Sequence, residues 1–263
     1  MPVPTYTMLG HGAPVLMLHG AGGNYRSFAP QVETLASLGW RAIAWNMPGY
    51  GRSAPLEPYG FKGLAASAAA LVEALAPVTG GAPLTLVGHG MGGMVALELT
   101  LRRPELVRQL LLSATAPAVQ PGDGYSRHVE QALAWLAEGR GMTEIAQTLL
   151  PRLVGSGALP AGVQLATLCQ AEVHAATWRR ALLALAQFDR RPGLGQLHVP
   201  TLLVAGEQDR VTPPAVLQGM AGAIAGARCV TLAHCGHLPH LERPDEFDQL
   251  LLDFLRDAPG RLH

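Results

Sequence analysis

The chain has 263 residues, of which 49% are hydrophobic and 14% are charged, and its 19 basic and 19 acidic side chains give a formal net charge of zero. This balance argues against a nucleic-acid-binding protein, which normally carries a basic excess, and no polybasic run marks an anionic membrane surface as a partner. The hydrophobic content is sufficient for a sizeable buried core.

Cysteine content and hydropathy indicate a reduced, cytoplasmic protein. The cysteines at positions 169, 229 and 235 form no C-x-x-C pair, and their odd number argues against a disulfide scaffold and a thiolate zinc site. The first residues lack the basic and apolar regions of a signal peptide, and no run of about 18 apolar residues is present to span a membrane. We therefore expect a cytoplasmic chain with no membrane partner, no metal and no organic cofactor. The sequence carries no signal for an oligomeric state.

Apolar runs and helical stretches alternate through the first part of the chain. Short apolar runs bounded by turn residues are typical of strands that are buried on both faces. The strands predicted in this way cover residues 14–18, 41–45, 83–87 and 107–113. Helical periodicity or a high content of Ala and Leu predicts helices over residues 28–38, 61–76 and 92–103.

The alternation stops after residue 114 and resumes after residue 187. Residues 115–187 have no strand pattern, and the helices predicted there cover residues 126–138, 142–150 and 161–187. The later part predicts strands over 200–205 and 228–232 and helices over 214–225 and 244–256. Such alternation predicts an α/β protein with a mostly parallel, doubly wound sheet. We therefore expect a core made of residues 1–114 and 188–263, with residues 115–187 as a helical cap or lid.

The strongest local motif is G-H-G-M-G-G at residues 88–93, between a predicted strand and a predicted helix. It resembles the nucleophile elbow of the α/β-hydrolase superfamily, whose pattern is G-x-S-x-G. The outer glycines suit a turn so tight that side chains would clash there. The central position, which carries the nucleophile in that pattern, is Gly90 in this chain.

Four further motifs resemble those of the same superfamily. They are H-G-A-G-G at residues 19–23, N-M-P-G-Y-G-R-S at 46–53, G-E-Q-D-R-V-T-P at 206–213 and G-H-L-P-H-L-E-R-P at 236–244. The order of elbow, acid and histidine along the chain is the one that this superfamily uses. In the second motif, Asn46 stands where the superfamily usually has Asp.

The resemblance implies a role for each matching residue. Asp209 would be the catalytic acid and His237 the catalytic base. The backbone N–H groups of Ala21 and Met91 would form an oxyanion hole. The residues expected to contact the substrate are His89, Gly20 and Ser113.

Gly90 removes the atom that acyl transfer needs at this position. A serine hydroxyl is activated by a histidine, which a carboxylate holds in the right tautomer. Without that hydroxyl no acyl-enzyme can form, and in a serine hydrolase the loss costs on the order of 10⁶ in kcat. Because glycine tolerates the strained backbone of an elbow, the variant Gly90→Ser is predicted to fold with slightly lower stability.

The helical stretch carries no motif. Trp135 and Trp178 are expected to pack within the lid. The charged and imidazole side chains expected on solvated helix faces are Arg127, His128, His174, Arg179 and Arg180.

Three interpretations remain open, each with a small molecule as the partner. In the first, the protein is a hydrolase of a small, partly apolar ester, lactone or carbon–carbon bond substrate, inactive or strongly impaired because Gly90 holds the nucleophile position. In the second, the His237–Asp209 pair is the general base of a cofactor-free lyase, oxygenase or water-activating enzyme. In the third, the protein binds a ligand and has lost the reaction.

Overall fold

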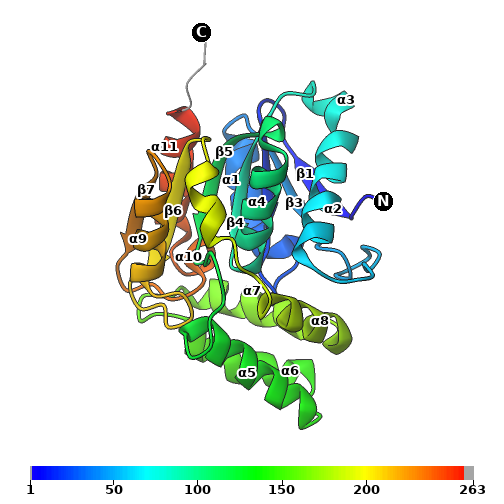
Figure 1. Cartoon of the computed structure of the whole chain (residues 1–263), viewed down its shortest axis with the longest axis vertical. Coiled ribbons are helices and arrows are strands. Elements are labelled where there is room, and N and C mark those ends of the chain that lie inside the picture. Colours follow the sequence, from blue (N-terminus) through cyan, green and yellow to red (C-terminus); the bar gives the residue numbers. More distant parts are fainter. Residues whose placement is uncertain (1, 258–263) are drawn as a thin grey trace.

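The structure, a computed structural model, describes residues 2–257. In this part of the chain seven strands form one sheet in the order β1-β3-β2-β4-β5-β6-β7 (Figure 1). The strands are β1 (Tyr6–Leu9), β2 (Pro14–Leu18), β3 (Arg41–Trp45), β4 (Leu84–His89), β5 (Val107–Ser113), β6 (Thr201–Gly206) and β7 (Arg228–Leu232). β1 is antiparallel to β3, and the other neighbouring pairs are parallel. The predicted fold class, a mostly parallel and doubly wound sheet, is confirmed.

β1 is an element that the sequence pattern does not predict. It forms an edge of the sheet and pairs with β3 alone, with Tyr6 opposite Trp45 and Leu9 opposite Ala42. Its side chains are largely exposed, so the strand has neither a buried run nor a clear alternation of apolar and polar residues. Pairing with its neighbour, rather than burial, makes this segment a strand.

Successive side chains of each central strand enter opposite hydrophobic layers, as the two-residue period of a strand requires. On β2, Leu16 and Leu18 belong to one layer and Val15 and Met17 to the other. The helices of the first layer are α2 (Phe61–Ala74), α4 (Met91–Arg102) and α9 (Pro214–Ala223). The helices of the second layer are α1 (Ala29–Ser37) and α11 (Pro244–Arg256). Burying one such leucine contributes about 1.5–3 kcal/mol, so these layers hold the strand ends in place.

Four helices lie between β5 and β6 in the chain: α5 (Gly124–Ala137), α6 (Met142–Leu153), α7 (Pro160–Ala171) and α8 (Ala175–Leu185). We call them the inserted helices. Figure 1 shows them grouped together at one end of the molecule, beyond the sheet. The single helix predicted over 161–187 is wrong, because the chain turns at residues 172–174 and forms α7 and α8 instead. No Gly or Pro marks this turn, so the apolar pattern runs through it.

Short helical turns complete the described chain. They are η1 (Tyr25–Phe28), α3 (Ala76–Thr79), η2 (Pro104–Leu106), η3 (Arg191–Gln196) and α10 (Pro239–Glu242). None of the helices within residues 2–257 is both long and apolar enough to cross a membrane.

Candidate active site

The turn between β4 and α4 has the geometry of a nucleophile elbow. Gly90 has φ +54° and ψ −119°, a conformation that side-chain-bearing residues rarely adopt. A Cβ on Gly92 would lie 2.0 Å from the carbonyl oxygen of Leu18, and one on Gly88 would lie 2.5 Å from the Cα of Gly93. The glycines on both sides of Gly90 are therefore required by the close approach of two backbone segments.

Position 90 itself has room for a side chain. A Cβ built there would lie 3.7 Å from the Cα of Gly20, 3.7 Å from Oη of Tyr125 and 3.8 Å from Nε2 of His237. These are ordinary van der Waals distances. The imidazole nitrogen is therefore within hydrogen-bond reach of a serine hydroxyl carried by that Cβ. The site can thus accept a serine without movement of its backbone.

Asp209 and His237 form a buried hydrogen-bonded pair. Nδ1 of His237 donates to Oδ2 of Asp209 at 2.8 Å. Thr212 donates to the same carboxylate through its hydroxyl at 2.7 Å and its backbone N–H at 3.0 Å, and Val211 N–H donates at 2.8 Å. Burial raises the pKa of Asp209, but the charge of His237 and these hydrogen bonds together lower it by a larger amount. The pKa of Asp209 therefore lies below its usual value. The ionised carboxylate leaves Nε2 of His237 free to accept a proton.

The loop after β2 presents a backbone donor beside the elbow. The N–H groups of Ala21 and Met91 have no acceptor among residues 2–257. Gly23 N–H donates to the carbonyl of Gly20 at 3.0 Å, and Oη of Tyr50 donates to the carbonyl of Ala21 at 2.8 Å. These bonds fix the peptide groups around Ala21, and Met91 is held as the first residue of α4, so each N–H group belongs to a fixed segment before a ligand arrives.

His19 holds the loop after β2 through hydrogen bonds of both ring nitrogens. Its Nδ1 donates to the carbonyl of Gly20 at 2.8 Å, and its Nε2 accepts from Met47 N–H at 3.0 Å. Burial lowers the pKa of His19 to about 4, so the ring stays neutral and in one tautomer. Both ring nitrogens are committed to structure, which excludes a proton-carrying role.

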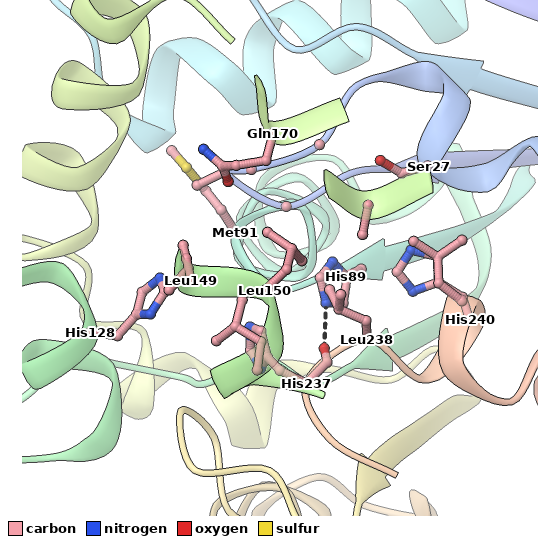
Figure 2. A pocket seen from close by; sticks show the side chains of 18 of the residues that line it. Ser27, His89, Met91, His128, Leu149, Leu150, Gln170, His237, Leu238 and His240 are labelled. Carbon is pink, nitrogen blue, oxygen red and sulfur yellow. Dashed lines mark hydrogen bonds between the residues drawn. The ribbon is translucent and has the colours of Figure 1, made fainter. Parts of the chain in front are cut away.

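His89 holds the loop that carries His237. Its Nε2 donates to the backbone carbonyl of His237 at 2.7 Å, the bond drawn in Figure 2, and the two rings lie 5.3 Å apart. Burial and the charge of His237 lower the pKa of His89 to about 3. The residue also lines the cavity described below, so it both supports and borders the site.

The connection between α6 and α7 is fastened to the same loop. His237 N–H donates to the carbonyl of Leu153 at 2.7 Å. The fully buried carboxylate of Glu242 accepts from the N–H groups of Gly155 at 2.7 Å and of Gly236 and Leu238 at 2.8 Å each. Glu242, the acid of the G-H-x-x-x-x-E motif, therefore joins the histidine loop to the inserted helices.

A cavity opens in front of Gly90 (Figure 2). Its lining includes most of the residues expected at the site, namely Gly20, Ala21, His89, Gly90, Met91 and His237. Ser113 differs from expectation. It is fully buried at the end of β5, does not line this cavity, and its hydroxyl has no hydrogen-bond partner in the described chain. Asp209 lies behind His237, as an orienting acid does.

The inserted helices supply cavity residues that sequence reasoning missed. Tyr125, Gln170 and Trp178 line the cavity, and so does His128, which the sequence places on a solvated face. Burial lowers the pKa of His128 to about 4. No motif surrounds these residues, and helical periodicity alone cannot tell a core-facing residue from one that faces a cavity.

A metal centre has no support within the described residues. Across 2–257, no group of three or more His, Cys, Asp or Glu side chains is placed to hold a metal ion.

The sheet order, the elbow and the acid–histidine pair define an α/β-hydrolase fold. A family model described by that name matches residues 13–244, and the chain belongs to this family. A pimeloyl-[acyl-carrier protein] methyl ester esterase from Stenotrophomonas maltophilia is 31% identical over 94% of each chain. Two esterases with solved structures are each 25% identical. One, from Exiguobacterium antarcticum, has a TM-score of 0.87 and covers 96% of this chain and 95% of its own. The other, from Thermogutta terrifontis, has a TM-score of 0.85 and covers 97% and 94%.

Proposed function

We propose that the cavity binds a small, partly apolar carboxylic ester or lactone, and that the protein carries every part of an acyl-transfer site except the nucleophile. The main support for this proposal is the space at position 90, where a side-chain Cβ would lie 3.8 Å from Nε2 of His237. Two unpaired N–H groups border the same space. The family relatives named as esterases support an ester as the substrate class.

The geometry gives each remaining group a step in ester hydrolysis once a serine is present at position 90. The serine oxygen attacks the ester carbonyl while its proton moves to Nε2 of His237. The carbonyl oxygen becomes an oxyanion held by the N–H groups of Ala21 and Met91. The tetrahedral intermediate collapses, and the alcohol leaves with the proton from Nε2. Water then hydrolyses the acyl-enzyme by the same route.

We also propose that the inserted helices act as a lid over the cavity. Residues from α5, α6, α7 and α8 all border the cavity, among them Tyr125, Leu149, Gln170 and Trp178. They exclude water from one side of the reacting carbonyl, which strengthens the electrostatic interactions inside. This supports the division into a core of residues 1–114 and 188–263 and a lid of residues 115–187.

The decisive experiment compares the protein with Gly90→Ser on short and medium aryl esters, together with a fluorophosphonate label. Gly90→Ser is expected to hydrolyse the esters at least about 10³-fold faster and to take the label, because a lone nucleophile loss costs roughly 10⁶ while other parts retain 10³–10⁴ over water. Gly90→Ser combined with His237→Ala is the matched control and should stay inactive and unlabelled. An inert and unlabelled Gly90→Ser that is folded would refute the acyl-transfer proposal.

A second candidate function is direct attack by water. The space beside Gly90 is bordered by Nε2 of His237 and Oη of Tyr125, two groups that can hold and polarise a water molecule. In this route the water oxygen attacks the carbonyl carbon while His237 takes a proton from that water. Gly90→Ala separates the possibilities, because its methyl group fills that space without adding a nucleophile. If the parent protein hydrolyses esters and Gly90→Ala does not, attack by water is favoured. If the parent and Gly90→Ala are both inactive, the result argues against attack by water.

A further inference from the structure

Two hydrogen-bonding atoms beside Gly90 are not used by any group of the described chain. A Cβ at position 90 would lie 3.8 Å from Nε2 of His237 and 3.7 Å from Oη of Tyr125. His237 bonds to Asp209 through Nδ1, which leaves Nε2 unpaired, and Oη of Tyr125 has no partner among the described residues. Both residues line the cavity, and neither atom is enclosed in the way that Oγ of Ser113 is. A molecule in the cavity can therefore reach both atoms.

The third neighbour of this space is apolar. It is the Cα of Gly20, which lies 3.7 Å from the same Cβ position, so this side contacts carbon. The cavity has room for molecules of about water size. A free molecule cannot stand at bonding distance from Gly90, and it therefore lies further into the cavity than a serine side chain would. A molecule with a hydroxyl at one end and one or two carbons at the other matches the three neighbours.

The two polar neighbours favour a neutral hydroxyl group over an ion. Burial and the charge of Asp209 raise the pKa of Tyr125, so its hydroxyl keeps its proton and donates it to a hydrogen bond. Nε2 of His237 accepts, because Nδ1 is the nitrogen that donates to Asp209. A hydroxyl oxygen can accept from Oη while its proton points to Nε2. No Lys or Arg is among the lining residues in the described chain, so an anion would be buried without a cation, which is costly.

We infer that this space is the binding site of a second substrate, a small neutral alcohol, and that the protein transfers the acyl group of an ester directly to that alcohol. The assignment rests on the ester substrate of the proposed function, and it gives the protein with Gly90 in place a reaction that needs no serine. The alcohol takes the position that a serine hydroxyl would have, beside the same base.

The transfer is balanced without any further reactant. The alcohol oxygen forms a bond to the acyl carbon while its proton moves to Nε2 of His237, and the N–H groups of Ala21 and Met91 hold the oxyanion. The bond between the acyl carbon and the oxygen of the leaving group then breaks, and Nε2 returns the proton to that oxygen. One ester and one alcohol become a new ester and a new alcohol, with no acyl-enzyme between them.

Water is the competing acceptor, and its attack gives hydrolysis instead of transfer. An alcohol brings a carbon to the Cα of Gly20, and burying one such group favours binding about fourfold. An alcohol held in the site also has a much higher effective concentration beside the acyl carbon than one in solution. Transfer should therefore saturate as the alcohol concentration is raised, which attack by an unbound alcohol does not do.

The test measures phenol release from an aryl acetate by the parent protein, with methanol or ethanol added over a range of concentrations. Release should rise with the alcohol and reach a plateau, and mass spectrometry should find the alkyl acetate as the product. Varying both substrates should give intersecting double-reciprocal lines, because both are bound before reaction. Gly90→Ser should instead give the parallel lines of a ping-pong enzyme. A fluorophosphonate should stop Gly90→Ser and leave the parent's transfer unchanged.

Two variants test the site itself. Gly90→Ala fills the space with a methyl group and should lower transfer at least about tenfold. Its matched control is Gly139→Ala, which changes another glycine of positive φ, outside the cavity, and should keep the transfer rate. Tyr125→Phe removes one hydrogen-bond donor and should raise the alcohol concentration for half-saturation about fivefold, the effect of one hydrogen bond. This second variant decides the question if Gly90→Ala does not fold.

The outcomes separate the alcohol site from the proposed function. An active Gly90→Ser beside a parent that forms no alkyl ester overturns the alcohol site alone. Transfer by the parent that rises in proportion to the alcohol, without a plateau and equally in Gly90→Ala or Tyr125→Phe, also overturns it. If the parent and a folded Gly90→Ser are both inert toward every ester, the alcohol site and the proposed function fall together.

Discussion

The loops at the strand ends and the inserted helices border the same cavity, but different forces specify them. The loops are fixed by backbone contacts: a Cβ at Gly92 would meet a carbonyl oxygen at 2.0 Å, and Glu242 binds three backbone N–H groups. The inserted helices contribute side chains such as Gln170 and Trp178 from helix faces that several residue types could occupy. In the proposed function, the groups that react therefore lie in loops where backbone contacts restrict the residue type. The groups that contact the substrate lie partly on helix faces that can accept several residue types.

The largest expected effect tests the loop side of this comparison. In the Gly90→Ser background, Asp209→Asn is expected to lower kcat by about 10⁴, because an amide no longer fixes the imidazole tautomer. Steady-state kinetics on an aryl ester measures it. Tyr125→Phe in the same background, on the helix side, should cost less than about tenfold. Equal losses in the two variants would erase the distinction between the regions.

The next effect tests the joint between the two regions, that is, the hydrogen bonds by which Glu242 connects the histidine loop to the inserted helices. Glu242→Gln places an NH₂ group among three N–H donors and should lower the free energy of unfolding by about 3 kcal/mol. Urea denaturation followed by circular dichroism measures the change. Glu246→Gln is the control, since that exposed carboxylate pairs with Arg243 and its loss should cost less than about 1 kcal/mol. A Glu242→Gln value as small as the control's would show that the joint contributes little.

A smaller effect compares a left-handed glycine in each region. Gly90→Ser and Gly90→Ala should each lower the free energy of unfolding by about 1–3 kcal/mol because of the elbow conformation. Gly139, which follows α5 with φ +78°, has open space around its Cα, so Gly139→Ala should cost about 1–2 kcal/mol from the conformation alone. Thermal unfolding of the three variants gives the order. A higher melting temperature for Gly90→Ser than for the parent would contradict the strain argument.

The last effect is one of pH and involves one histidine on each side, the buried His89 and the partly buried His128. The pKa values of His89 and His128 are lowered from 6.5 to about 3 and about 4. Between pH 6.5 and these values the unfolded chain binds protons that the folded protein does not, so stability falls as pH falls, by about 1.4 kcal/mol per pH unit for each histidine. His89→Gln and His128→Gln should each remove one such contribution in urea denaturation at a series of pH values. An unchanged slope would mean that the replaced histidine already titrates normally.

The predictability of each element follows from the same difference. The central strands were predictable because their runs are buried on both faces, and the elbow, acid and histidine turns because tight turns restrict residue type. β1 was not, since its exposed side chains carry no pattern. The break between α7 and α8 at residues 172–174 lacks a helix-stop residue. The cavity positions of Gln170 and His128, and the burial of Ser113 away from the cavity, depend on tertiary packing that spacing alone does not report.

The joint at Glu242 has a mechanical consequence. The inserted helices are tied to the sheet at their two chain ends and again in the middle, where Gly155 and Leu153 are bonded to the histidine loop. Because α6 packs against α7 and α5 against α8, the four helices hold one another as a single unit. A displacement of that unit would therefore act on the main chain of His237 through the hydrogen bond that its N–H donates to Leu153.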